Sequence, residues 1–171
     1  MRGRKLTLIA IFIFFSVRIF SQTSVAQAQA VFIYNFTRFI EWPKEYWTGD
    51  FKIGIYGSSE LYDDLKSFTS GKIVGQQPIS ILKFSKLDDI ADCHILFVAY
   101  GKTKDMDAIV SKLGSFKTLI ITEKNGALET GSAINFVIAD DKLKFELKIG
   151  NATKYGLKIN SKLEEMAIAK Y

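Results

Sequence analysis

The sequence predicts a single α/β domain whose sheet is mixed, mostly parallel and flanked by helices. Residues 94–99 and 118–122 are near-continuous apolar runs, typical of strands buried on both faces of a parallel sheet. Segments of helical periodicity alternate with such runs through the middle of the chain, which favours βαβ units. Near the end, residues 143–149 alternate between apolar and charged side chains. We therefore expect a C-terminal antiparallel hairpin, followed by a closing helix.

The start of the chain predicts a secretory signal peptide. Three cations among the first five residues precede an apolar run over residues 6–15. This run is about half of the roughly 20 apolar residues that a membrane-spanning helix needs. Three cleavage positions fit the pattern: after Phe20, after Ser21 or after Ala28. We therefore expect residues 1–28 to contain the leader, and the protein to be exported.

The positive charge of the chain belongs mainly to this leader. The sequence has 23 Lys+Arg and 18 Asp+Glu, a net charge of +5. Four of the cations and none of the acids fall in the first 18 residues, so 19 cations and 18 acids remain. The basic balance therefore gives no support for nucleic-acid binding. We expect residues 29–171 to form one domain.

The domain opens with an aromatic stretch. Phe32, Phe36 and Phe39 recur at the i, i+4, i+7 spacing of one helix face, and Pro43 is a helix stop. We expect a helix over residues 30–42 that packs mainly on the sheet.

The remaining elements follow in order along the chain. The pattern predicts strands over residues 51–56, 79–84, 94–99, 118–122, 133–139 and 143–149, the last two joined by Asp140 and Asp141. Helical segments are expected from Ser58 or Ser59 to about Phe68, and over residues 87–91, 104–113 and 162–170.

No catalytic set or metal site emerges from the sequence. The only cysteine and the only histidine, Cys93 and His94, are adjacent. On a strand their side chains leave by opposite faces, so they cannot act as a hydrogen-bonded nucleophile and base. A single cysteine forms no internal disulfide, and no spacing brings three or four metal ligands together. We expect a binding protein without cofactors rather than an enzyme.

One turn leaves an alternative open. Gly54, Gly57, Ser58 and Ser59 run from a strand into a helix, where backbone N–H groups can hold an anion. With Gly57, Ser58 and Ser59 as ligand-binding residues, the protein would be an exported small-ligand-binding domain or a cryptic enzyme. The competing interpretation is a tight turn with a serine cap, because the glycines of a dinucleotide fingerprint are incomplete.

The aromatic stretch can also be interpreted as a motif. Five segments resemble, in order, the YfiR-like family of small exported proteins from Gram-negative bacteria: residues 30–43, 93–97, 131–136, 144–147 and 156–163. The family is a domain of unknown function. The resemblance covers nearly the whole chain after the leader.

The resemblance implies a periplasmic regulator that is not an enzyme. A member of the family represses a membrane-bound diguanylate cyclase by binding its sensor part outside the cytoplasm, which lowers cyclic-di-GMP signalling. The implied partner is therefore the extracytoplasmic sensor domain of an inner-membrane signalling protein, and the family implies a homodimer. Redox control in that member is tied to paired cysteines. This chain has only Cys93, so no disulfide switch is implied.

A partner-binding surface on the aromatic helix would use residues outside its packed face. We expect these to be Asn35 and Arg38 on the exposed flank, with Trp42 and Pro43 at the end. On this hypothesis, replacing Trp42 spares the fold and weakens partner binding.

Overall fold

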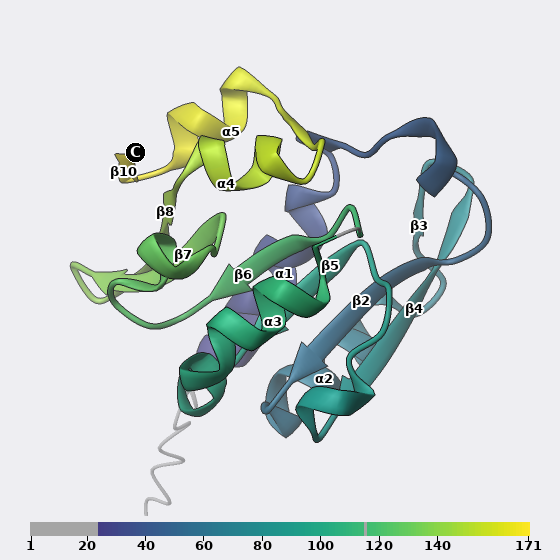
Figure 1. Cartoon of the computed structure of the whole chain (residues 1–171), viewed down its shortest axis with the longest axis horizontal. Helices are drawn as coiled ribbons and strands as arrows, with labels where there is room; N and C mark the ends of the chain where they lie inside the picture. Colours follow the sequence, from purple (N-terminus) through teal and green to yellow (C-terminus); the bar gives the residue numbers. More distant parts are fainter. Residues whose placement is uncertain (1–23, 115) are drawn as a thin grey trace, which may run out of the picture.

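The structure is a computed structural model that describes residues 24–114 and 116–171 (Figure 1). Residues 1–23, which hold most of the expected leader, lie outside this part of the chain. The centre is an eight-stranded sheet with strand order β10-β8-β7-β6-β5-β2-β4-β3. Its strands are β2 (Phe51–Tyr56), β3 (Ile73–Val74), β4 (Gln77–Phe84), β5 (Ile95–Val98), β6 (Leu119–Thr122), β7 (Ile134–Ala139), β8 (Lys142–Leu147) and β10 (Ala169–Lys170).

Parallel pairs dominate this sheet. Strands β4, β2, β5, β6 and β7 run parallel, as do β8 and β10, whereas β3/β4 and β7/β8 are antiparallel. The expected mixed, mostly parallel sheet with a C-terminal hairpin is confirmed. Every residue of β5 and β6 is buried, as the two apolar runs predicted.

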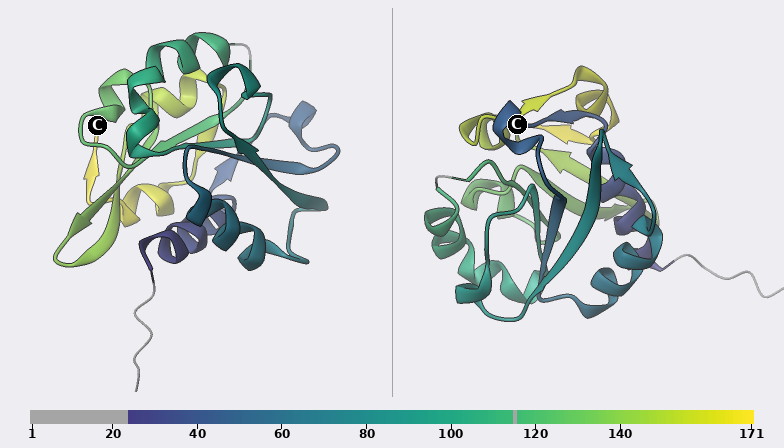
Figure 2. Two further views of the ribbon diagram at one scale, coloured as in Figure 1. Left: turned by 90° about the horizontal axis from the view of Figure 1, so that it is seen from below. Right: turned by 90° about the vertical axis from the view of Figure 1, so that its right-hand side faces the viewer.

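Helices cover both faces of the sheet. The helices α1 (Val25–Phe36) and α2 (Ser59–Thr69) lie on one face, and α3 (Met106–Lys112) lies on the other (Figure 2). Short 3-10 segments complete the path: η1 (Lys44–Tyr46), η2 (Leu87–Asp89), η3 (Tyr100–Asp105) and η4 (Ala127–Thr130). No helix within the described ranges combines the length and apolar character needed to cross a bilayer.

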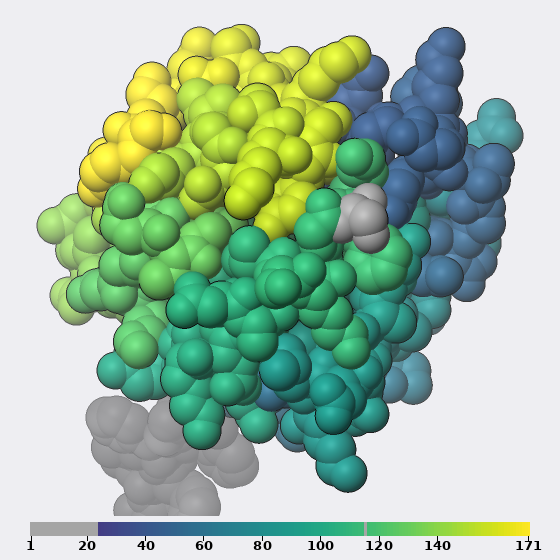
Figure 3. Space-filling view, in the orientation of Figure 1, coloured from purple at the N-terminus to yellow at the C-terminus, as the bar shows by residue number. Residues whose placement is uncertain are grey.

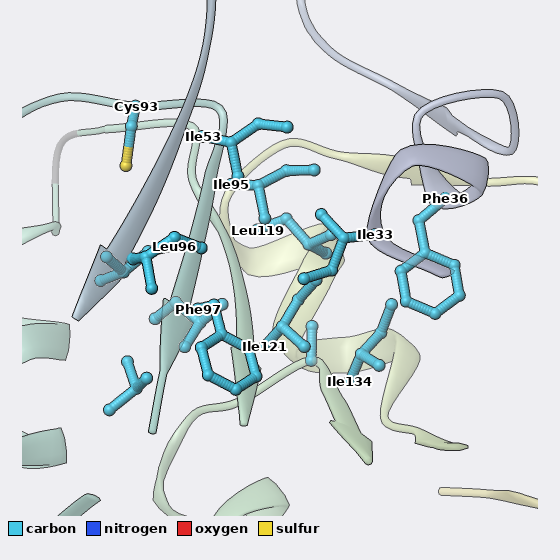
Figure 4. Packing of buried hydrophobic residues seen from close by; sticks show 14 of the residues in the cluster. Ile33, Phe36, Ile53, Cys93, Ile95, Leu96, Phe97, Leu119, Ile121 and Ile134 are labelled. Atoms are coloured by element: carbon cyan, nitrogen blue, oxygen red, sulfur yellow. The ribbon is translucent and has the colours of Figure 1, made fainter. Parts of the chain in front are cut away.

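Buried side chains fill both faces of the sheet, and α1 covers one part of this core. Ile33 and Phe36 of α1 are fully buried and face Ile121 and Ile134 of the central strands (Figure 4). The ring of Phe36 lies 5.0 Å from that of Phe145 in a T-shaped arrangement. The aromatic stretch therefore contributes buried side chains to the core, as its spacing predicted.

The first helix begins earlier than expected. Ser24 is its N-cap: its hydroxyl accepts from the Gln27 N–H at 3.1 Å, and its own N–H donates to Gln27 Oε1 at 3.2 Å. This reciprocal capping box is a strong helix start. Ala28, after which one of the three cleavage positions falls, therefore lies in the first turn of α1.

The same helix also ends earlier than expected, so the prediction of one helix over residues 30–42 is wrong. It stops at Phe36, and Thr37 Oγ1 donates to the Tyr34 carbonyl at 2.7 Å. Ile40 and Glu41 then form β1 (Ile40–Glu41), which pairs antiparallel with β9 (Lys158–Ile159) as a separate two-stranded sheet. This pairing with a distant segment overrides the helical periodicity.

The C-terminal region also differs from expectation. The second hairpin strand ends at Leu147 rather than at residue 149, and α4 (Ile149–Lys154) follows it. The closing helix α5 (Ser161–Met166) stops before residue 170, because Ala169 and Lys170 add the parallel strand β10 beside β8. The hairpin strand β8 is therefore an interior strand, with β7 on one side and β10 on the other.

Candidate functional site

A groove separates the segment after α1 from the β3–β4 hairpin. Its volume is about 510 Å³. The apolar lining residues are Ile40, Trp42, Trp47, Phe51 and Val74. We call this the tryptophan groove. The two segments that form its walls, residues 37–51 and 74–77, meet on the right-hand side of the molecule (Figure 3).

The two tryptophans have different places in this groove. Trp42 is only 4% exposed, stands edge-on to Phe51 with the ring centres 5.0 Å apart, and donates from Nε1 to the His94 carbonyl at 3.1 Å. Trp47 is 53% exposed and donates from Nε1 to the Trp42 carbonyl at 2.8 Å. Trp42 is thus part of the floor, and Trp47 forms the rim.

The expectation that Trp42 lies at the end of the helix, outside its packed face, is therefore wrong. The helix ends six residues earlier, and the chain then crosses the amino ends of the strands, where the indole is buried against Phe51. Its replacement is therefore expected to destabilise the fold rather than to spare it. The exposed tryptophan of the groove is Trp47, which the sequence analysis did not single out.

His94 holds the floor in position. The Lys52 N–H donates to Nδ1 at 3.0 Å, and Nε2 lies 2.9 Å from the Tyr46 carbonyl. A carbonyl only accepts, so the neutral imidazole carries its proton on Nε2. The ring also stacks on Phe51, with 4.2 Å between centres. Burial lowers the pKa of His94, so the neutral form is favoured.

Gln77 fixes the opposite wall. Its Nε2 lies within hydrogen-bond distance of three backbone carbonyls, those of Tyr46, Thr48 and Gly49, at 3.0–3.2 Å. The start of β4 is thereby attached to the loop that carries Trp47. Sequence reasoning missed Gln77 and Trp47 because neither belongs to a periodic pattern.

Cys93 and His94 do not form a reactive pair, as expected. Both ring nitrogens of His94 face Lys52 and Tyr46. Cys93 is 1% exposed, and burial raises the pKa of its thiol to about 12. A thiol that stays protonated at neutral pH is a poor nucleophile and a poor metal ligand. Within the described ranges, no group of three His, Cys, Asp or Glu side chains could hold a metal ion.

None of the other residues predicted for partner binding lines the groove. Arg38 is exposed, with its guanidinium 5.4 Å from the centre of the Tyr34 ring. It lines a second hollow of about 320 Å³ with β9. Asn35 and Pro43 are half-buried. Ile40 and Glu41 line both hollows, so β1 is the wall between them.

The Gly57 turn has the geometry of a helix cap. Gly57 has φ of +91°, and Ser58 Oγ accepts from the Leu61 N–H at 3.3 Å. The aliphatic part of Lys102 packs directly on Gly57, and its ammonium lies 4.9 Å from the centre of the Tyr56 ring. The hydrogen bond from the Leu61 N–H to Ser58 Oγ favours the capping interpretation. Ser59 is exposed as the first residue of α2.

Comparisons with solved structures show relatives of the fold. A conserved domain protein from Vibrio cholerae matches with a TM-score of 0.61 and 8% identity over 86% of this chain. An ABC domain from Streptococcus pneumoniae in complex with L-Trp matches with a TM-score of 0.57 and 15% identity over 85%. The chain spans 60% of the length of each of these structures, and the likeness concerns the fold alone.

A comparison with family models identifies the family. No curated protein matches this sequence significantly. The model described as YfiR/HmsC-like, a domain of unknown function, matches residues 26–168. The match includes both walls of the tryptophan groove, the second hollow beside Arg38 and nearly the whole sheet. The chain therefore belongs to the YfiR/HmsC-like family.

Proposed function

We propose that the protein is a periplasmic regulator that binds and represses a membrane-bound signalling protein. We further propose that this signalling protein is a diguanylate cyclase, which produces cyclic-di-GMP. Its partner is the extracytoplasmic sensor domain of that protein. Membership of the YfiR/HmsC-like family supports the class of function. The single observation that supports the site is the tryptophan groove, with the half-exposed indole of Trp47 at its rim.

The groove suits the docking of an apolar side chain from a partner. Large, rigid aromatic residues are enriched among the side chains that dominate binding energy at interfaces. Trp42 and Trp47 are each held by a hydrogen bond from the indole nitrogen, so little side-chain freedom is lost on binding. Glu41 offers the one carboxylate of the lining and pairs with Lys158 at 3.2 Å. Asn35, Arg38 and Pro43 would then flank the docked partner.

Site-specific crosslinking tests the proposal directly. A photo-reactive phenylalanine replaces Trp47, and the exported protein is irradiated in the cells that produce it. The matched control carries the same group at Tyr100, which is 63% exposed at the other end of the strands. We expect position 47, and not position 100, to crosslink to a membrane protein with an extracytoplasmic domain. Equal crosslinking at both positions would refute the groove as the binding site.

Cyclic-di-GMP measurements test the identity of the partner. Deletion of the gene is expected to raise the cellular cyclic-di-GMP level, and the wild-type gene is expected to restore it. A Trp47→Ala variant should fold and fail to restore the level, whereas Tyr100→Ala should restore it. An unchanged level after deletion would refute repression of a cyclase.

The homodimer that the family implies is a separate proposal. Sedimentation of the exported protein at several concentrations tests it, and a monomer at all of them would refute it.

A further inference from the structure

Strand β4 presents an open edge along most of its length. On one side all residues from Ile79 to Phe84 pair with β2. On the other side β3 pairs only with Gln77 and Pro78. Among the described residues, no other strand pairs with this side of the remaining six residues, Ile79 to Phe84. This open edge faces the viewer in the right panel of Figure 2. Such an edge is a template for an added strand.

The register shows which backbone groups of this edge are free. The Lys52 and Tyr56 carbonyls accept from the His94 and Ala99 N–H groups, so these two residues of β2 face β5. Ile53, between them, therefore faces β4. In each pair of opposite residues of a parallel ladder, only one residue directs its backbone N–H and C=O at the neighbouring strand. Because Ile53 does so toward β4, the N–H and C=O of its partner Ile81 point outward. Ile79 and Lys83 share this orientation by alternation.

The edge carries positive charge that has no carboxylate partner. The ammonium groups of Lys66 and Lys83 lie 5.6 and 5.3 Å from the centre of the same Tyr62 ring. Among the described residues neither of them forms an ion pair, whereas Lys144, Lys148 and Lys158 do. Two like charges held on one ring at an open edge indicate an anionic occupant.

The side chains beside the edge describe that occupant further. Ile79 and Ile81 are only half-buried, and they share the α2 face of the sheet with Lys83. An added strand would place alternate side chains opposite these three residues. Apolar groups fit opposite the isoleucines, and a carboxylate fits opposite Lys83 and beside Lys66.

We propose that the outer edge of β4 binds an extended acidic segment of another protein, which pairs as an added strand with Ile79, Ile81 and Lys83. A second copy of this chain is the poorer occupant. Two-fold pairing of β4 with itself would bring two pairs of Lys66 and Lys83 side chains together without any new carboxylate. The edge lies outside the tryptophan groove and is tested independently of it.

A displayed library of random peptides, selected on the exported protein, tests this proposal. We expect peptides in which Asp or Glu alternates with β-branched residues, and we expect their binding to weaken with salt. The Lys66→Glu/Lys83→Glu variant should bind them at least about tenfold more weakly and should select basic peptides instead. Lys162→Glu/Lys170→Glu, changed in α5 and at the opposite edge of the sheet, is the matched control and should bind like the wild type.

A backbone variant separates strand addition from simple charge attraction. Ile81→Pro removes an outward N–H and no hydrogen bond within the sheet, because proline is tolerated where the N–H faces solvent. It should keep its circular dichroism spectrum and lose peptide binding. Enrichment of apolar or basic peptides, no enrichment at all, or acidic peptides that bind the Ile81→Pro variant equally would each overturn the proposal. So would a dimer in solution that Ile81→Pro dissociates, since the second copy would then occupy the edge.

Discussion

Replacing Trp42 by alanine is expected to destabilise the domain strongly. The indole is 4% exposed and packs between Phe51 and His94. Truncating a buried aromatic side chain to alanine typically costs about 3–5 kcal/mol of the free energy of unfolding. With a typical urea dependence of about 2 kcal/mol per molar for a domain of this size, the midpoint of unfolding should fall by about 1.5–2.5 M.

Two variants separate the contributions to this loss. In Trp42→Phe most of the packing remains and only the Nε1 hydrogen bond is lost. The His94 carbonyl still accepts from the Leu119 N–H at 2.8 Å, so we expect a cost of only about 1 kcal/mol. Trp47→Ala removes a half-exposed ring and one hydrogen bond, for about 1–2 kcal/mol.

Urea unfolding of the purified protein, followed by circular dichroism, measures all three variants. The expected order of destabilisation is Trp42→Ala, then Trp47→Ala and Trp42→Phe at similar values. A midpoint for Trp42→Ala within about 0.5 M of the wild type would refute the assignment of Trp42 to the core.

Three further predictions follow from buried groups and from the helix start. Burial lowers the pKa of His94 below the usual 6.5 of an imidazole, so the contribution of the neutral ring to the stability of the fold is complete above pH 6.5 and is lost as the pH falls through the lowered pKa. The melting temperature should therefore drop between pH 7 and pH 5, and a His94→Gln variant that keeps the same drop would contradict this origin. Cys93, with its pKa raised to about 12, should react with a thiol reagent only after unfolding in urea, and reaction in the native protein would count against its burial. N-terminal sequencing of the exported protein should find a start at or before Ser24, because cleavage after Ala28 would remove the capping box; a start at Gln29 would contradict this.

The sequence was sufficient for elements that are defined by their own pattern. The buried strands β5 and β6, the capped helix after Ser58 and the hairpin turn at Asp140 all have local signals. These signals lie in apolar runs, cap residues and turn residues, which act within a few positions of the chain.

The remaining elements depend on segments far away in the chain. Strand β1 is a strand only because β9 lies beside it, and the two residues of β10 pair with β8 although they follow a helical pattern. The tryptophan groove has the same origin, since its walls come from two loops that Gln77 joins. Short-range periodicity carries no information about such pairings.

The pairing of β1 with β9 also bears on how the protein is made. Glu41 and Lys158 are 117 residues apart in sequence, so this contact is among the most non-local of the fold. Non-local contacts close late, because the chain between them must be ordered first. During synthesis β1 can therefore pair only after β9, near the end of the chain, has been made. Until then the wall shared by the tryptophan groove and the second hollow is incomplete, so neither hollow has its final lining.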